Sequence, residues 1–181
     1  MLSILEQDGL IEFKPEGSEG WLVKPKVRAW RRAQELRELA TRSDQAFVAM
    51  RFSNTLLPAY RDGIAPALRR SGYRPLRIDH VQHNGTIDDR IIAEIRRSAV
   101  VVADLTENAN GVYFEAGFAL GRSIEVIWMC REDHLGGAHF DVQQYNMIVW
   151  KQPSDIAEKL YERVRATMPI RQPLPDPATV A

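Results

Sequence analysis

The sequence has little cysteine, no excess of charge of either sign and no long hydrophobic run. Its 181 residues hold one cysteine, Cys130, which excludes an intramolecular disulfide and a zinc site built from several cysteines. Lysine plus arginine and aspartate plus glutamate both number 24, so the chain lacks the positive field of a nonspecific nucleic-acid binder. No apolar run approaches the roughly 20 residues of a membrane span, and acidic residues interrupt the apolar N-terminus, unlike in a signal peptide. We therefore expect a soluble, cytoplasmic protein that binds no membrane.

Several motifs for cofactors and catalysis are absent as well. The chain has no G-x-G-x-x-G, no G-x-x-x-x-G-K-[ST] and no G-x-S-x-G elbow. Its four histidines do not pair with acidic residues at the spacing of metal ligands, so we expect no metal and no cofactor. Cys130 precedes Arg131, which is compatible with an acidified thiol, but a buried structural thiol is the simpler interpretation.

The chain is expected to divide at about residue 44. In residues 1–44, short strands at 10–13 and 21–23 flank a glycine turn, and a helical pattern follows from 25 to 42. This arrangement resembles the end of a winged helix, and it is equally compatible with an accessory hairpin that packs on the main domain. Residues 169–181 contain four prolines and read as a flexible, exposed tail.

Residues 45–168 alternate between strand and helix patterns. The apolar runs at 46–50 and 99–103 are typical of strands that are buried on both faces. Further strands are expected at 74–79, 124–130 and 146–150, with helices between them. Such alternation predicts an α/β fold, a flavodoxin-like, doubly wound, five-stranded parallel sheet.

Ligands of such sheets bind beyond the carboxyl ends of the strands, which makes Glu115 and Asp104 the candidate catalytic residues. Glu115 lies near the start of a helix, where the helix dipole would favour its ionised form, and it can attack an electron-poor sugar carbon. By pattern alone, a capping-box glutamate is the simpler interpretation. Asp104 ends a strand and can position the sugar, or it can accept backbone N–H groups in the turn.

The candidate substrate-binding residues follow the strand ends or lie near helix starts. Most of them also have a structural interpretation: Arg51 can neutralise a phosphate or form a surface ion pair, Asp88 can cap a helix, and Asn110 can serve a turn. Gly111 suits a close backbone approach to a ligand, whereas Gly117 and Gly121 suit packing of the helix on the sheet. The full set is Met50, Arg51, Phe52, Asp79, His83, Asn84, Asp88, Asn110, Gly111 and Tyr113.

The segments FVAMRF (47–52), IDDRIIAEIRRSAVVVADLT (87–106), NGVYFEAGFALGR (110–122) and VIWMCRED (126–133) resemble the nucleoside 2-deoxyribosyltransferase superfamily. FDVQQYNMIVW (140–150) also fits an uncharacterised bacterial branch of that superfamily. The resemblance implies that Glu115 is the nucleophile, that Asp104 matches a strand-end aspartate, and that the protein is a homodimer. Asn110 stands where the transferases commonly carry an acidic residue, which favours hydrolysis over base exchange.

Three functions remain open. The leading hypothesis is an N-glycosidase whose partner is a small nucleoside or nucleotide. Toll/interleukin-receptor-type domains that cleave NAD have a similar sheet and glutamate, so an NAD-cleaving effector activated by assembly is an alternative. A non-catalytic nucleotide sensor is the third, although direct DNA binding is not expected at zero net charge and without an intact recognition helix.

Overall fold

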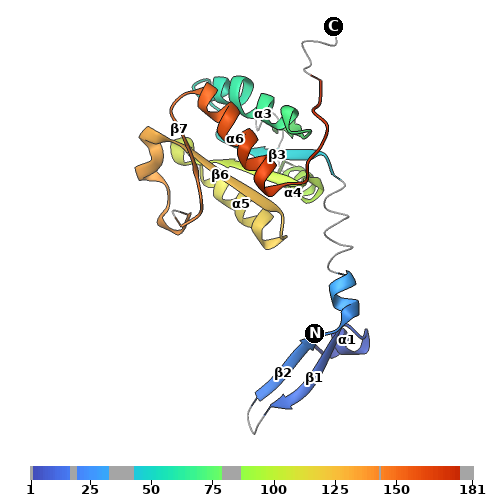
Figure 1. Cartoon of the computed structure of the whole chain (residues 1–181). Coiled ribbons are helices and arrows are strands. Elements are labelled where there is room, and N and C mark those ends of the chain that lie inside the picture. The colour runs from blue at the N-terminus through green and yellow to red at the C-terminus, as the bar shows by residue number, and fades with distance from the viewer. Residues whose placement is uncertain (1, 17–19, 33–42, 79–86, 143, 176–181) are drawn as a thin grey trace. The chain divides into compact units, whose positions relative to one another are not determined.

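The structure, a computed structural model, describes all residues except 1, 17–19, 33–42, 79–86, 143 and 176–181 (Figure 1). The chain divides into two compact units, Met1–Arg42 and Ser43–Ala181. Among the described residues, no helix has both the length and the apolar character needed to cross a membrane.

The first unit contains a short helix and an antiparallel hairpin. Helix α1 (Leu2–Gln7) ends at Gly9, whose positive φ of 68° suits glycine in the turn that leads into the first strand. Strands β1 (Ile11–Glu16) and β2 (Gly20–Pro25) pair along their whole length, which confirms the expected hairpin. A helical turn follows at 27–32, and the remainder of the expected helix lies outside the described residues.

The second unit is built on a five-stranded parallel sheet with the strand order β4-β3-β5-β6-β7, which confirms the predicted flavodoxin-like α/β fold. The strands are β3 (Gln45–Ala49), β4 (Arg74–Leu76), β5 (Val100–Asp104), β6 (Glu125–Arg131) and β7 (Ile148–Trp150). The helices that pack on the sheet are η1 (Ala59–Ile64), α3 (Ala65–Arg70), α4 (Ile87–Arg97), α5 (Asn110–Gly121) and α6 (Pro153–Thr167). Three short helices, η3 (Thr106–Asn108), η4 (Glu132–Gly137) and η5 (Phe140–Val142), follow the carboxyl ends of β5 and β6.

Helices cover both faces of this sheet, which explains why the central strands are apolar without interruption. Val48 and Val102 point to the face covered by η1, α3 and α6, whereas Phe47 and Val101 point to the face covered by α4 and α5. All four side chains are buried. Burying an aliphatic or aromatic side chain of this size contributes roughly 1.5–3 kcal/mol, so the strand core holds the carboxyl edge of the sheet firmly in place.

The helix expected to end near Gly72 begins with π-helical turns over η1 and becomes α-helical at α3. Pro66 has no amide proton for the carbonyl of Asp62 four residues earlier, and its ring crowds that carbonyl, which accounts for the irregular turns ahead of it. Gly72 ends the helix with a φ of 78°, as the sequence predicted.

The first residues after α6 are largely exposed, as the sequence predicted, and hydrogen bonds attach them to the main unit. The hydroxyl of Tyr73 donates to the carbonyl of Pro169 at 3.1 Å. The amide of Leu174 donates to the carbonyl of Arg69 at 2.9 Å. Prolines prevent a helix here, but an extended chain can still exchange hydrogen bonds with the α3–β4 turn. Residues 176–181 lie outside the described residues.

Candidate active site

The site lies at the point where the strand order of the sheet reverses. After β3 the chain crosses to β4 on one side, and it then returns to place β5 on the other side of β3. Ala49 and Ala103 are register partners near the carboxyl ends of β3 and β5, so the segments that follow these two strands start side by side. In open parallel sheets, this crevice is where ligands bind.

Glu115 is a buried carboxyl group in the second turn of α5, with 6% of its surface exposed. The N-cap of α5 is Ala109, which makes no side-chain cap hydrogen bond, and the first turn contains no acidic residue. The capping-box interpretation of Glu115 is therefore wrong, because the helix begins too early for Glu115 to cap it.

Burial raises the pKa of Glu115 from 4.5 to about 7. The expected ionised form is thus not favoured, because the loss of solvation raises the pKa. Near neutral pH, a carboxyl group with this pKa populates both its protonated and its ionised form. Many catalytic carboxyl groups behave in this way.

Asp104 ends β5 and is completely buried. Its Oδ1 accepts the backbone N–H of Thr106 at 2.7 Å, and its Oδ2 accepts the indole N–H of Trp150 at 3.2 Å. Burial raises its pKa to about 6, against the opposing effects of those hydrogen bonds and of the charge of Arg131. The structure thus shows the turn-holding contacts that the sequence left as an alternative, with an added link to β7.

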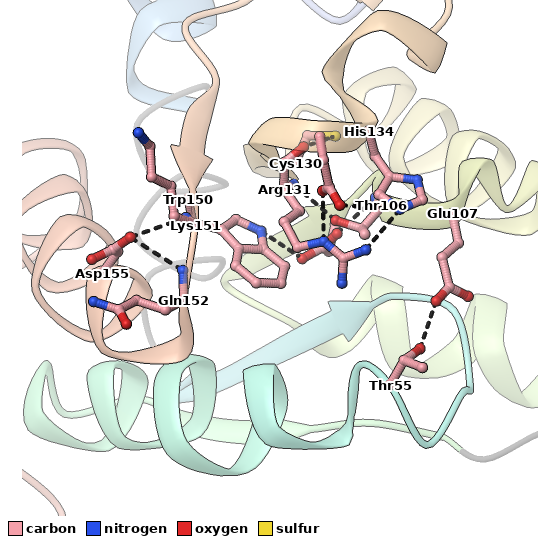
Figure 2. A network of polar contacts seen from close by, with 12 residues as sticks. Thr55, Thr106, Glu107, Cys130, Arg131, His134, Trp150, Lys151, Gln152 and Asp155 are labelled. Carbon is pink, nitrogen blue, oxygen red and sulfur yellow. Dashed lines mark hydrogen bonds and ion pairs between the residues drawn. The ribbon is translucent and has the colours of Figure 1, made fainter.

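Thr106 and Arg131 extend this network to β6. The hydroxyl of Thr106 accepts the backbone N–H of Arg131 at 2.9 Å. The guanidinium of Arg131 forms an ion pair with Asp133 at 2.6 Å. It also forms a 2.7 Å hydrogen bond with Nε2 of His134 (Figure 2). Burial raises the pKa of the neighbouring Cys130 thiol to about 11, so the acidified-thiol interpretation is wrong and the structural one holds.

Glu107 is a site residue that the sequence analysis missed. It lies in η3 with a positive φ of 64°, and its carboxylate forms an ion pair with Nε of Arg51 at 3.2 Å. The hydroxyl of Thr55 donates to Oε1 of Glu107 at 2.6 Å (Figure 2). An acidic residue directly after Thr106 at a strand end was the available signal. Its partners come from the segment after β3, about fifty positions earlier in the chain, which no local pattern shows.

A cavity of about 410 Å³ lies beside the start of α5. Tyr113 shapes its wall, since its hydroxyl donates to Oδ1 of Asn108 at 2.9 Å and accepts the backbone N–H of His139 at 3.0 Å. This volume suits a small polar molecule of the size of a nucleoside. The cavity is lined by Asn108, Asn110, Tyr113, Gly137, His139, Asp141 and Val142, so it brings together two of the predicted substrate-binding residues.

Several other predicted site residues have different surroundings. Met50 is buried in the core on the η1, α3 and α6 side of the sheet. Phe52 is half-buried, with the guanidinium of Arg77 5.0 Å from its ring centre. Asp88 is the second residue of α4, and its side chain lies outside the described part. Asp79, His83 and Asn84 also lie outside the described residues.

The glycines of α5 do not pack as the sequence suggested. A methyl group added at Gly111, Gly117 or Gly121 would meet nothing within 4 Å. All three are exposed, so the prediction that Gly117 and Gly121 pack against the sheet is wrong. Val112, Ala116 and Ala119 form the face of α5 that packs on the sheet.

The described residues contain no group of three or more histidine, cysteine, aspartate or glutamate side chains placed to hold a metal ion.

No protein-family model matches this chain, and no curated protein matches its sequence. Solved structures do match it in three dimensions. The CMP N-glycosidase of Clostridium botulinum has a TM-score of 0.52 at 13% identity, over 64% of this chain and 97% of that one. A 2-desoxiribosyltransferase from Leishmania mexicana has a TM-score of 0.49 at 17% identity, over 65% and 97% of the two chains. At this identity the likeness to the first of these is one of fold: the second unit has the flavodoxin-like fold of that N-glycosidase.

Proposed function

We propose that this protein is an N-glycosidase that cleaves the bond between base and sugar in a nucleoside or nucleotide. The observation that carries the proposal is Glu115, a buried carboxyl group with a pKa of about 7 in the helix that follows β5. A sugar carbon that loses its base gains positive charge in the transition state, and a desolvated carboxylate stabilises such a charge strongly. The shared fold of the C. botulinum CMP N-glycosidase supports the same chemistry.

The reaction takes two displacements at the anomeric carbon. Ionised Glu115 attacks this carbon, and the C–N bond breaks with its electron pair moving to the base, which takes up a proton from water. Water then attacks the same carbon, the bond to Glu115 breaks, and the carboxylate is restored while the second proton of that water passes to solvent. The net change is hydrolysis, with retention of configuration after two inversions.

The proposal also assigns roles to Asp104 and Asn110. Asp104 acts as a positioning residue, because its two hydrogen bonds hold the β5–α5 turn that leads to Glu115. Asn110 contributes a neutral amide to the cavity beside α5, and it offers no acid to protonate an incoming or departing base. We therefore favour hydrolysis over transfer to a second base, and we keep the homodimer as part of the proposal.

The test is a base-release assay by liquid chromatography on a panel of nucleosides, nucleoside monophosphates and NAD. Glu115→Gln keeps the shape of the side chain and removes the nucleophile, so release should fall by at least 10³-fold, on the order reported for the loss of a covalent nucleophile. Glu125→Gln is the matched control, since Glu125 is exposed at the first residue of β6, at the amino end of the strand. It should leave the rate unchanged.

The same panel separates the alternatives. Release from NAD alone would favour the NAD-cleaving effector. Nucleotide binding without any base release would favour the sensor. Adding an isotopically labelled second base would show transfer if label entered the nucleoside pool. Activity that survives Glu115→Gln would overturn the proposed role of this residue.

A further inference from the structure

Three donors from the segment after β3 converge on the carboxylate of Glu107. Thr55 and Ser53 donate hydroxyl hydrogen bonds to Oε1 at 2.6 and 3.3 Å. Arg51 forms an ion pair through Nε with Oε2 at 3.2 Å, and its Nη1 donates to the backbone carbonyl of the same glutamate at 3.3 Å. The Glu107 side chain is 21% exposed, so these contacts replace much of its water.

This cluster lies at the carboxyl ends of β3 and β5, where the strand order reverses. Arg51, Ser53 and Thr55 follow β3, and Glu107 follows β5. The cluster therefore lies at the edge of the sheet where ligands of such folds bind, and Glu107 directly precedes Asn108, which lines the cavity beside α5.

The negative charge of Glu107 also acts on a second arginine, Arg131. The pKa of Arg131 is raised first by its hydrogen bond with Asp133, and the negative charge of Glu107 adds to this effect. Arg131 is fixed at this edge because its backbone N–H donates to Thr106, the residue that precedes Glu107.

One arginine with two hydroxyl groups is a donor set well suited to a phosphate group. In this chain, a carboxylate of the protein itself takes up those donors. A nucleoside monophosphate would bring about 1.5 to 2 further negative charges close to Glu107, while the charge of Arg51 is already neutralised. Repulsion between like charges in a partly desolvated site disfavours such a ligand, whereas an uncharged sugar hydroxyl can still donate to a carboxylate.

The backbone supports a specific placement of Glu107. Glu107 and Asn108 both have positive φ values, of 64° and 50°, which is uncommon for residues other than glycine. A strained turn of this kind persists only where its surroundings hold it, and here the contacts to Arg51 and Thr55 do so.

We propose that Glu107 is the specificity-determining residue that makes this site select uncharged nucleosides and reject nucleoside monophosphates. The proposal rests on the N-glycosidase function proposed above. The expected substrates are uncharged nucleosides, because Arg51 pairs with Glu107 and not with a substrate phosphate.

The kinetic test compares a nucleoside with its own 5′-monophosphate. In the wild type, kcat/KM should favour the nucleoside. Glu107→Gln keeps the length of the side chain and removes its charge, so the monophosphate-to-nucleoside ratio of kcat/KM should rise by at least tenfold. Adding Arg51→Gln should cancel that rise. Glu132→Gln is the matched control, since Glu132 is an exposed glutamate that pairs with Lys151, and it should leave the ratio unchanged.

A binding measurement keeps this proposal separate from the proposed reaction. Isothermal titration calorimetry with inorganic phosphate should show binding to Glu107→Gln, weaker or no binding to the wild type, and none to Glu107→Gln with Arg51→Gln. If phosphate binds in this way but no base is released from any substrate, the N-glycosidase function is refuted. The exclusion of phosphate by Glu107 would still be supported. An unchanged substrate ratio and unchanged phosphate binding in Glu107→Gln would overturn the proposal. If that variant fails to fold, Glu107→Gly removes the same charge at a φ that glycine prefers, and the same two outcomes apply.

Discussion

Glu115 and Asp104 are two carboxyl groups that the fold removes from water. Burial is the main cause that raises the pKa of each, to about 7 for Glu115 and to about 6 for Asp104. Asp104 is compensated in part, because it accepts hydrogen bonds from Thr106 and Trp150. A carboxyl group with a raised pKa stabilises the fold while it is protonated and weakens it once it ionises, so these residues make the stability of the fold depend on pH.

The first prediction concerns the pH dependence of stability that Glu115 creates. Its pKa rises from 4.5 to about 7, so the folded protein binds this proton more tightly than the unfolded chain does. The stabilisation by the proton is fully present below pH 4.5 and is lost as the pH rises through 7. Above pH 8, Glu115→Gln should therefore be more stable than the wild type by up to roughly 3 kcal/mol. Urea unfolding of both proteins at several pH values measures this difference.

The difference between the two proteins should shrink toward pH 4, where Glu115 is protonated in the folded and the unfolded state. Asp104 is present in both proteins, so its own titration cancels in the comparison. A stability difference that does not vary with pH would contradict the raised pKa of Glu115.

At the scale of secondary structure, α5 carries Glu115 and has two different faces. Val112, Ala116 and Ala119 are buried on the sheet, whereas Phe114 is 60% exposed. The glycines of α5 suggested close packing of this helix on the sheet. A glycine is needed for packing only where another backbone comes close to its Cα. At Gly63 in η1 such an approach exists, since an added Cβ would lie 2.7 Å from the carbonyl oxygen of Pro153.

The second prediction uses this contrast between Gly117 and Gly63. Gly117→Ala fills open space in the interior of a helix, and it should stabilise the protein by about 0.5–1 kcal/mol through the lower backbone entropy of the unfolded chain. Gly63→Ala should destabilise it by about 1–3 kcal/mol, because η1 must move away from α6. Thermal unfolding of the two variants and the wild type tests the predicted gain and the predicted loss of stability. A loss of stability from Gly117→Ala would show that a partner covers this face of α5.

At the scale of the whole molecule, the chain consists of two compact units. The described members of its two apolar clusters run from Ala46 to Met168. In the first unit, β1 pairs with β2 in a two-stranded sheet. The second unit therefore has the elements that a domain needs to fold alone.

The third prediction follows from this division. A protein that begins at Ser43 should keep the midpoint of thermal unfolding of the main unit within a few degrees, because its core remains complete. Circular dichroism on the full chain and on the shortened one measures this. A shortened chain that fails to fold would show that residues 1–42 are part of the fold of the second unit. Sedimentation equilibrium of both proteins would also test the homodimer that the sequence resemblance implies.

The sequence by itself determined the main strands and helices of the fold and pointed to one side chain of the candidate site. The strands around Phe47 and Val101 were predictable because a parallel strand covered on both faces is apolar throughout. Glu115 was found because its helix follows the clearest strand and resembles a known superfamily. Glycines such as Gly72 ended helices where their positive φ required it.

Only the tertiary structure decided what surrounds these residues. The bond between Asp104 and Trp150 joins residues 46 positions apart, and the contacts of Glu107 with Arg51 and Thr55 span more than 50. Neither pairing follows a local period, because each exists only when β3, β5 and β7 end at the same edge of the sheet. Likewise, the pKa of Glu115 depends on how much water the finished fold excludes, which a residue type cannot specify. Local patterns thus determined the strands and helices, and long-range packing determined the charges at the site.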